Sequence, residues 1–224
     1  MGQSRKVITV DGVGASGKSA LARLLAERLG FAHLNSGLLY RAAGYLAMQS
    51  GVTPDDEKGM SDLLQNHSIE LRFDRLKGNE VLIDGVCRDA ELQSQDISRL
   101  ASQVAKLPTV RAHFVPIQRS AFEPHGVVAE GRDMGTVIFP EASVKFFVTA
   151  DSKVRAERRY KQLVAKGDHV DVESIERDLA RRDHEDAHRS LSPMKPAEGA
   201  VLVDNSTGTL EEIVDRMHAV VASS

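Results

Sequence analysis

Residues 12–19 read GVGASGKS, which matches the pattern GxxxxGK[ST] at every fixed position. A short β-rich run, residues 6–10, precedes this segment, and apolar residues at helical spacing follow it as far as Gly30. Glycines let consecutive backbone N–H groups point into one concavity, and the following helix presents its N-terminus to the same place. The order of strand, loop and helix predicts an α/β fold whose loop binds a polyphosphate.

The loop residues have separate expected roles. Lys18 supplies a mobile cation for the β and γ phosphates, and the hydroxyl of Ser19 is the expected ligand for Mg²⁺. A glycine-rich turn with a solvated lysine is the alternative, which the flanking strand and helix disfavour. The residues predicted to bind the nucleoside triphosphate are Gly12, Val13, Gly14, Ala15, Ser16, Gly17, Lys18, Ser19 and Ala20.

The loop alone leaves a kinase, a GTPase and an ATP-driven machine open. No convincing base-reading motif of the NKxD type is present, and a chain of 224 residues has little room for a large machine. The net charge is −3 and only 4% of residues are aromatic, which argues against a nucleic-acid partner. One cysteine and no long apolar run predict a cytoplasmic protein without disulfides or a membrane partner.

Short apolar strands alternate with helices along most of the chain, which predicts a parallel sheet covered on both faces. The expected fold class is a P-loop three-layer α/β fold with a five-stranded parallel sheet, an inserted region and a short helical lid. Further strands are predicted at residues 31–34, 127–129, 144–149 and 201–203, and helices at residues 36–49, 109–122, 152–166, 172–188 and 209–221. Pro116 is expected to kink the helix that contains it, and the capping box Thr209-x-x-Glu212 is expected to begin the last helix.

The segment 52–107 has a different pattern from the rest of the chain. Strands are predicted at residues 68–73, 80–83 and 86–88, with a turn around Lys77-Gly78-Asn79, and Pro108 is expected to end the helix before it. The simplest interpretation is an antiparallel sheet inserted into the α/β chain. The expected division is therefore a core of residues 1–51 and 108–224, a lid at about residues 155–172 and an inserted region at residues 52–107.

Gly131-Arg132-Asp133 follows a buried strand, at the sheet edge where open parallel sheets bind ligands. The alternative is that Arg132 and Asp133 form a surface ion pair. Four arginines lie on the two charged helices after residue 151 and suit a lid that neutralises a transferring phosphoryl group, although each can also belong to a solvated face. They are Arg158, Arg159, Arg182 and Arg189.

At this point the chain resembles the bacterial cytidylate (CMP) kinases of the nucleoside monophosphate kinase group. The resemblance runs nearly end to end and rests on DGVGASGKS, LNSGLLYR, ASQVAKLPTVR, EGRDMGTVIFP, ERRYKQL and RRDHEDAHR. It implies that ATP, with Mg²⁺, phosphorylates CMP and dCMP to CDP and dCDP by in-line transfer. It also implies that the inserted region binds the monophosphate, and a monomer is expected.

The resemblance carries residue roles onto matching positions. The implied catalytic residues are Lys18, Arg132, Asp133, Arg158 and Arg182. The implied substrate-binding residues are Ser36, Tyr40, Arg41, Ser102, Arg111, Arg132, Asp133, Arg182, Asp186 and Arg189, and Asn205, Ser206 and Thr207 match the loop beside the adenine. The chain departs from the usual pattern at Asn35 and Glu130, where Asp is common, at Gln93, where Arg is common, and in GKSA, where the family often has GKG followed by Ser or Thr.

The base preference also has a physical basis. Cytosine presents an N4 amine, which favours a carboxylate acceptor, whereas uracil presents an oxygen that Asp133 would repel.

Other functions stay open from sequence alone: a P-loop kinase for another small acceptor such as UMP, or a nucleotide-binding regulatory module. His184-Glu185-Asp186-Ala187-His188 also matches the HExxH zinc hydrolase signature, but the helix around it is charged on all sides and no third ligand is clearly placed.

Overall fold

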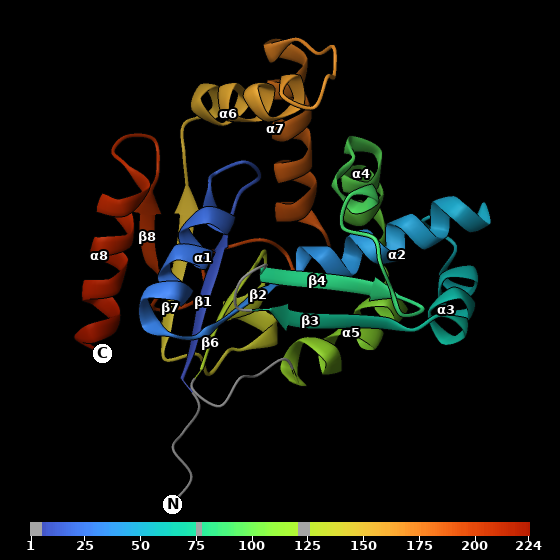
Figure 1. Cartoon of the computed structure of the whole chain (residues 1–224), viewed down its shortest axis with the longest axis horizontal. Coiled ribbons are helices and arrows are strands. Elements are labelled where there is room, and N and C mark those ends of the chain that lie inside the picture. The colour runs from blue at the N-terminus through green and yellow to red at the C-terminus, as the bar shows by residue number, and fades with distance from the viewer. Residues whose placement is uncertain (1–5, 75–77, 121–125) are drawn as a thin grey trace, which may run out of the picture.

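The computed structural model of the chain describes residues 6–74, 78–120 and 126–224 (Figure 1). Its centre is a five-stranded sheet in the order β2-β6-β1-β7-β8, and every neighbouring pair is parallel. The strands are β1 (Val7–Gly12), β2 (Ala32–Asn35), β6 (Val127–Gly131), β7 (Val144–Thr149) and β8 (Val201–Asp204). This sheet confirms the predicted α/β class and the predicted five parallel strands.

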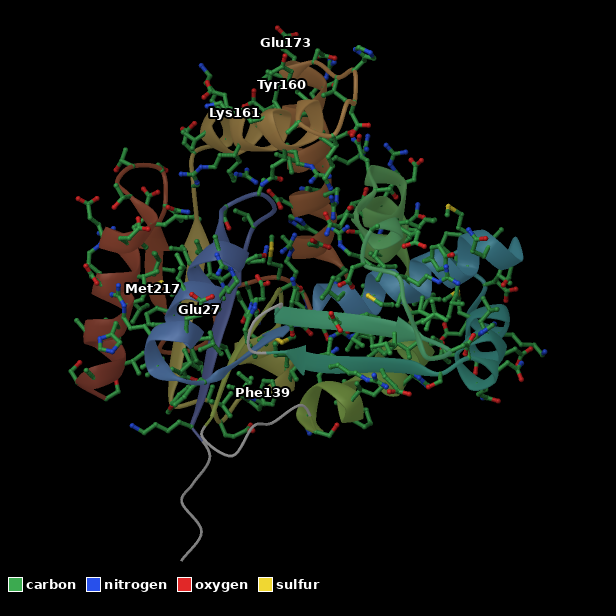
Figure 2. All side chains as sticks on the ribbon, viewed as in Figure 1. Glu27, Phe139, Tyr160, Lys161, Glu173 and Met217 are labelled. Carbon is green, nitrogen blue, oxygen red and sulfur yellow. The ribbon has the colours of Figure 1, made fainter. Side chains whose placement is uncertain are left out.

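Helices α1 (Lys18–Leu29) and α8 (Leu210–Ala222) cover one face of the sheet. Ile8 and Val10 of β1 are fully buried against their apolar sides, in a cluster that includes Met217 of α8 (labelled in Figure 2). The capping box predicted for α8 is present, because Thr209 and Glu212 accept each other's backbone N–H groups. The apolar spacing of both helices is therefore explained by this one core.

The opposite face carries a second cluster around the segment that follows β6. This segment contains a π-helical turn, η2 (Met134–Ile138), and Phe139 (labelled in Figure 2), and it packs on Leu34 and Val127 of the sheet. Residues from α5 (Pro108–Ser120) lie against the same cluster. A π-helix places one extra residue in a turn and is often found near functional sites.

The inserted region contains the antiparallel sheet that the sequence predicts. Its elements are α3 (Glu57–Asn66), β3 (Ile69–Asp74), β4 (Gly78–Ile83), β5 (Val86–Cys87), η1 (Glu91–Gln93) and α4 (Gln95–Val104), and α2 (Gly37–Ser50) precedes it in the core. β3 pairs with β4, and β4 pairs with β5, all antiparallel. The predicted turn around Lys77 lies outside the described residues. A separate apolar cluster joins α2, α3, α4, α5 and the hairpin (Figure 1, on the right).

Pro108 does not end the preceding helix, as the sequence analysis expected, but begins the next one. α4 ends at Val104, and Pro108 is the first residue of α5. A proline fits the first turn of a helix because its missing N–H would have no partner there. Pro116 lies inside α5, which is described to Ser120, so the predicted end of this helix near residue 122 lies outside the described residues.

Two charged helices, α6 (Ser152–Val164) and α7 (Val172–His188), stand above the carboxyl ends of the central strands (Figure 1, top). They pack on each other through Ala156, Leu163, Ile175 and Leu179, and they carry exposed charged side chains, among them Lys161 and Glu173 in Figure 2. Among the described helices, none has both the length and the apolar character that crossing a membrane requires.

Candidate nucleotide-binding site

A cavity of about 600 Å³ opens at the carboxyl ends of β1 and β6, between the inserted region and helices α6 and α7. Most of the predicted site residues line it, although they come from widely separated parts of the chain. They are Gly14, Ala15, Gly17, Lys18, Ser19, Ala20, Ser36, Tyr40, Arg41, Ser102, Arg111, Arg132, Asp133, Arg158, Arg182, Asp186, Arg189 and Asn205. Those absent from the lining are Gly12, Val13, Ser16, Ser206 and Thr207.

Gly12 is required by a close backbone approach rather than by phosphate contact. Its φ is +148°, and a Cβ there would lie 2.0 Å from the carbonyl oxygen of Val148 on the neighbouring strand. The loop then turns back on itself, since Ser16 is fully buried and its hydroxyl donates to the carbonyl of Val13 at 3.0 Å. Gly12, Val13 and Ser16 thus shape the loop from beneath.

The far side of the loop rests on the segment after β8. Asn205 is buried, and its side-chain amide donates to the carbonyl of Ser16 at 2.7 Å. A Cβ on Gly17, whose φ is +84°, would lie 2.4 Å from that amide nitrogen. Asn205 therefore braces the loop directly, whereas Ser206 accepts a hydrogen bond from the Asp151 N–H and Thr207 is exposed outside the cavity.

Positive charge is concentrated at the loop and the start of α2. Burial, together with the charge of Arg132, lowers the pKa of Lys18 to about 7. Burial and the nearby charges of Arg182 and Arg159 lower the pKa of Arg41 to about 10. A group of partly desolvated cations that disfavour one another's charge is an arrangement that a polyanionic ligand stabilises.

Arg132 and Asp133 do not pair with each other, which excludes the surface ion pair considered as the alternative. Arg132 Nε donates to Asp186 Oδ2 at 2.9 Å. Asp133 is only 3% exposed and lies between two other cations. Its Oδ2 accepts from Arg111, and Arg189 Nη2 lies 3.7 Å from its Oδ1. Arg132 and Asp133, although adjacent in sequence, therefore pair with different residues of the same cavity.

Asp11 holds the segment that carries Asp133, a role that the sequence analysis missed. Its Oδ1 and Oδ2 accept from the backbone N–H groups of Met134 and Gly135, each at 2.8 Å. Burial raises the pKa of Asp11 to about 6, although the two amides act in the opposite direction. The end of the strand before the phosphate loop is therefore tied directly to the turn after Asp133.

Ser36 occupies the N-cap position of α2, but its side chain does not cap the helix. Its hydroxyl donates to the carbonyl of Glu130 at 2.7 Å, which joins α2 to β6. The first-turn amide of Gly37 instead donates to Asn35 Oδ1 at 3.1 Å. Arg41, one turn later, donates from Nη1 to the carbonyl of Leu92 at 2.7 Å, so it also holds the inserted region.

Glu130 has the environment of a metal-ligating carboxylate. It is 1% exposed, and neither carboxylate oxygen has a well-formed hydrogen bond among the described residues, although His33 Nε2 lies 3.3 Å from Oε1. Burial raises the pKa of Glu130, but His33, Lys18 and the nearby Ser19 hydroxyl outweigh this effect and lower it below its usual value. An ionised carboxylate with unused oxygens beside a hydroxyl suits a hard divalent cation.

Two donors from α6 and α7 that lack a partner among the described residues also face the cavity. Arg158 Nη1 and Arg182 Nε are buried without a hydrogen-bond partner among the described residues, and both side chains line the cavity. Arg182 Nη2 donates to the Ser102 hydroxyl at 3.3 Å, which links α7 to the inserted region. Buried guanidinium nitrogens without a protein partner suit an anionic ligand.

The sequence analysis also missed Arg155 and Asp183, which form a buried ion pair beside the phosphate loop. Each lies one helical turn before a residue that was identified, Arg158 and Asp186 respectively. That i, i+3 spacing on a charged helix was the only available signal. Their contacts to the loop join residues more than a hundred positions apart, which periodicity cannot reveal.

The HExxH segment does not form a metal centre. The rings of His184 and His188 stack with centroids 4.0 Å apart, and His188 Nδ1 is 2.8 Å from the carbonyl of His184. Glu185 accepts from Lys106 at 2.8 Å, and Asp186 from Arg132. Within the described ranges, no group of three or more His, Cys, Asp or Glu side chains is arranged to hold a metal.

Comparison with known proteins agrees with the resemblance read from the motifs. The family model for cytidylate kinase matches residues 8–223. A cytidylate kinase of Thermotoga sp. (strain RQ2) is 42% identical over 211 residues, covering 94% of each chain. One from Stutzerimonas stutzeri (strain A1501) is 39% identical over 219 residues, covering 96% of this chain and 95% of the relative.

A solved structure of an uncharacterised protein from Eubacterium ventriosum shares the fold. Its TM-score is 0.53 at 13% identity, covering 98% of this chain and 100% of that one. At this identity the likeness concerns the fold alone. The match over nearly the whole length to the family model and to the curated relatives shows that this chain belongs to the cytidylate kinase family.

Proposed function

We propose that this protein transfers the γ-phosphoryl group of ATP to CMP and dCMP, giving ADP with CDP or dCDP. One observation carries the proposal: a single cavity joins the phosphate loop to a buried Asp133 held between Arg111 and Arg189. The first element binds a triphosphate, and the second offers a carboxylate to a base that carries an amine. The family membership of the chain supports the same reaction.

The donor end of the cavity binds ATP. The backbone amides of the loop and the start of α1 provide N–H groups and the positive end of a helix dipole for the phosphates. Lys18 Nζ lies 3.4 Å from the carbonyl of Val13, so its chain folds back over the loop with its charge in the cavity. A triphosphate restores the charged form of this amine, which burial disfavours in the free protein.

The acceptor end binds the monophosphate and its base. Arg41 and Arg132 grip the acceptor phosphate, and both line the cavity on the side of the inserted region. Asp133 accepts from the cytosine N4 amine, because a carboxylate has about four lone-pair sites and two arginines leave some of them free. Asp186, held by Arg132, together with Arg182 and Ser102 reaches the sugar.

Ser19 and Glu130 are the residues that fit Mg²⁺, because a cavity-facing hydroxyl stands beside an ionised carboxylate with unused oxygens. When bound, the ion supplies neutralisation of charge on the phosphate oxygens. The chain departs from the common family pattern at Glu130, where Asp is usual.

Transfer of the phosphoryl group requires no covalent intermediate with the protein. The acceptor phosphate is already anionic, so no general base is needed, and the donor and acceptor groups need alignment and neutral surroundings. Arg158 and Arg182 line the same cavity with guanidinium nitrogens that have no partner among the described residues, which suits the charge that develops during transfer. The lid at residues 155–172 closes over them and excludes water, which suppresses hydrolysis of ATP.

Kinase activity toward another small acceptor, such as UMP, is the competing proposal. The buried Asp133 argues against UMP because uracil presents O4 where cytosine presents an amine.

We further propose that the protein is a monomer and lies in the cytoplasm. The single cysteine suits a reducing compartment, and one chain supplies both ends of the cavity.

A coupled assay of ADP release tests the proposal across six acceptors: CMP, dCMP, UMP, AMP, GMP and dTMP. The expected result is rapid release with CMP and dCMP and a kcat/KM for UMP lower by about 10-fold or more. Equal rates with UMP would contradict the role of Asp133. Binding of ATP without release of ADP in any of the mixtures would mean a regulatory module rather than a kinase.

A further inference from the structure

The backbone N–H and the backbone carbonyl of Gly14, the third residue of the phosphate loop, are both held by one ion pair. Its N–H donates to Asp183 Oδ1 at 2.8 Å, and its carbonyl accepts from Arg155 Nη1 at 3.0 Å. The same Arg155 nitrogen pairs with Asp183 Oδ2. The two side chains are only 11% and 13% exposed, so solvent screens these contacts little.

Each partner is itself fixed by the helix that carries it. Arg155 on α6 also donates from Nε to the carbonyl of Ala150, directly after β7, at 3.1 Å. Asp183 lies on α7, one turn after Leu179, whose side chain packs over the loop. A Cβ built on Gly14 would lie 3.3 Å from Leu179 Cδ2 and 3.4 Å from Asp183 Oδ1. The loop and α7 are therefore in direct contact.

Ala15, the next residue of the loop, also contacts α6 and α7. Ala15 has a φ of +56°, which costs free energy for a residue with a Cβ. Its methyl group packs against the apolar cluster that joins α6 and α7. An unfavourable backbone conformation persists only where the surroundings impose it, and here the surroundings are the two lid helices.

The ion pair has an electrostatic consequence for the cavity. The carboxylate of Asp183 raises the pKa of both Lys18 and Arg132, although burial is the largest effect on each, so it lies close to the groups that receive phosphate. A bare carboxylate at this point would repel a triphosphate. Arg155 neutralises it while leaving the hydrogen bond to Gly14 in place.

We propose that Arg155 and Asp183 are positioning residues for ATP: as a neutral pair they clamp the backbone N–H and carbonyl of Gly14 and fix the phosphate loop against α6 and α7. The inference rests on the proposed function for its kinetic readout alone. The clamp makes the geometry of the loop depend on the lid helices, so that the donor site is complete only where these helices lie as they do here. Neither residue touches the reacting atoms.

A double-mutant cycle at the two positions tests the clamp. Arg155→Met leaves a buried carboxylate facing the triphosphate, and the KM for ATP should rise by about 10-fold or more, with the KM for CMP within about 2-fold of the wild type. Asp183→Asn on the same background removes the repulsive charge but keeps an acceptor for the Gly14 N–H. The double variant should therefore recover about 10-fold of the lost ATP affinity.

The second readout is hydrogen exchange of the Gly14 amide in the protein without nucleotide. This N–H should exchange about 10-fold faster in Arg155→Met, and also in Asp183→Asn, because a charge-assisted hydrogen bond is weakened in both. A matched control is the ion pair of Asp178 and Arg181 on the same helix, 2.6 Å apart and more exposed. Asp178→Asn and Arg181→Met should leave both the exchange rate and the KM for ATP unchanged.

The clamp is wrong if the Arg155→Met protein melts cooperatively yet matches the control variants in exchange and in KM for ATP. It is equally wrong if the double variant binds ATP no better than Arg155→Met. Should Arg155→Met not fold, the isosteric Asp183→Asn variant decides through the exchange of Gly14 alone. Failure of the proposed function looks different, because the wild type itself would then release no ADP with CMP while the exchange results would still stand.

Discussion

At the scale of single residues, burial determines what each side chain of the cavity can do. Lys18 and Asp11 carry shifted pKa values because both leave water, whereas Asp133 is buried together with two arginines that compensate its charge. These differences distinguish the phosphate-binding end from the base-binding end. Single substitutions at the two ends should therefore have separable kinetic effects.

Asp133→Asn tests the base-binding end. The amide keeps the volume but replaces one acceptor oxygen by a donor, which suits uracil O4 and opposes the cytosine amine. We expect the ratio of kcat/KM for CMP over UMP to fall by about 10-fold or more, measured by ADP release with each acceptor. An equal loss for both acceptors would mean that Asp133 is structural, through its pairs with Arg111 and Arg189.

Lys18→Ala tests the donor end. The substitution removes the cation from the phosphate loop but leaves the backbone amides, so kcat should fall by about 100-fold or more. Thermal melting checks that the variant is folded, which we expect because, among the described residues, the Lys18 ammonium makes a single long hydrogen bond, to the carbonyl of Val13 at 3.4 Å. A variant that melts like the wild type and turns over at a similar rate would contradict the assignment of the loop.

At the scale of elements, the sequence predicted what depends on local pattern. The phosphate loop, the β-strands and the capping box of α8 follow from spacing and turn chemistry, and the structure confirms them. The error at Pro108 came from a residue that ends one helix or begins the next equally well. The hydrogen bond of the Ser36 side chain was not predicted, because its partner, the carbonyl of Glu130, comes from a strand far along the chain.

The residues that the sequence analysis missed share this cause. Asp11, Arg155 and Asp183 act on backbone groups that are distant in sequence, and no local pattern distinguishes them from other charged residues. The helices that carry the last two were predicted correctly. The contacts between elements, which complete the site, depend on tertiary packing that a single sequence does not encode in its periodicity.

Thr209→Ala tests a purely structural element. The variant loses the side-chain bond to the Glu212 N–H and should unfold with a free energy lower by about 1 kcal/mol in urea titration. Thr209→Ser keeps a hydroxyl at the N-cap and serves as the control with near-normal stability. A loss of activity without a loss of stability would show that this end of α8 takes part in nucleotide binding instead.

At the scale of the whole molecule, the cavity is shared by the parallel core, the inserted region and the two charged helices. Bonds that cross between these parts, such as Arg41 to Leu92 and Arg182 to Ser102, make their relative positions part of the site. Asp11 makes a similar link inside the core, between β1 and the turn after Asp133. Its ionisation should therefore be visible in the stability of the whole fold.

The pH dependence of stability tests the buried carboxyl of Asp11. Its pKa is about 6 in the folded protein against an ordinary value of 3.8 for an aspartate, so between these two pH values the folded state binds one more proton than the unfolded state. The penalty for burying the charge is present above pH 6 and is relieved as the pH falls toward 4. Relative to Asp11→Asn, the wild type should gain unfolding free energy between pH 7 and 5. Parallel curves for the two proteins would show that Asp11 does not titrate in this range.

The central claim is that the γ-phosphoryl group of ATP is transferred to a cytosine nucleotide within one cavity. The most direct measurement follows a label in the γ-phosphate of ATP during incubation with CMP and Mg²⁺, with the products separated by chromatography. The account predicts that the label appears in the β-phosphate of CDP, with little released as inorganic phosphate. Label that stays in ATP, or that appears as inorganic phosphate whether or not CMP is present, would contradict it.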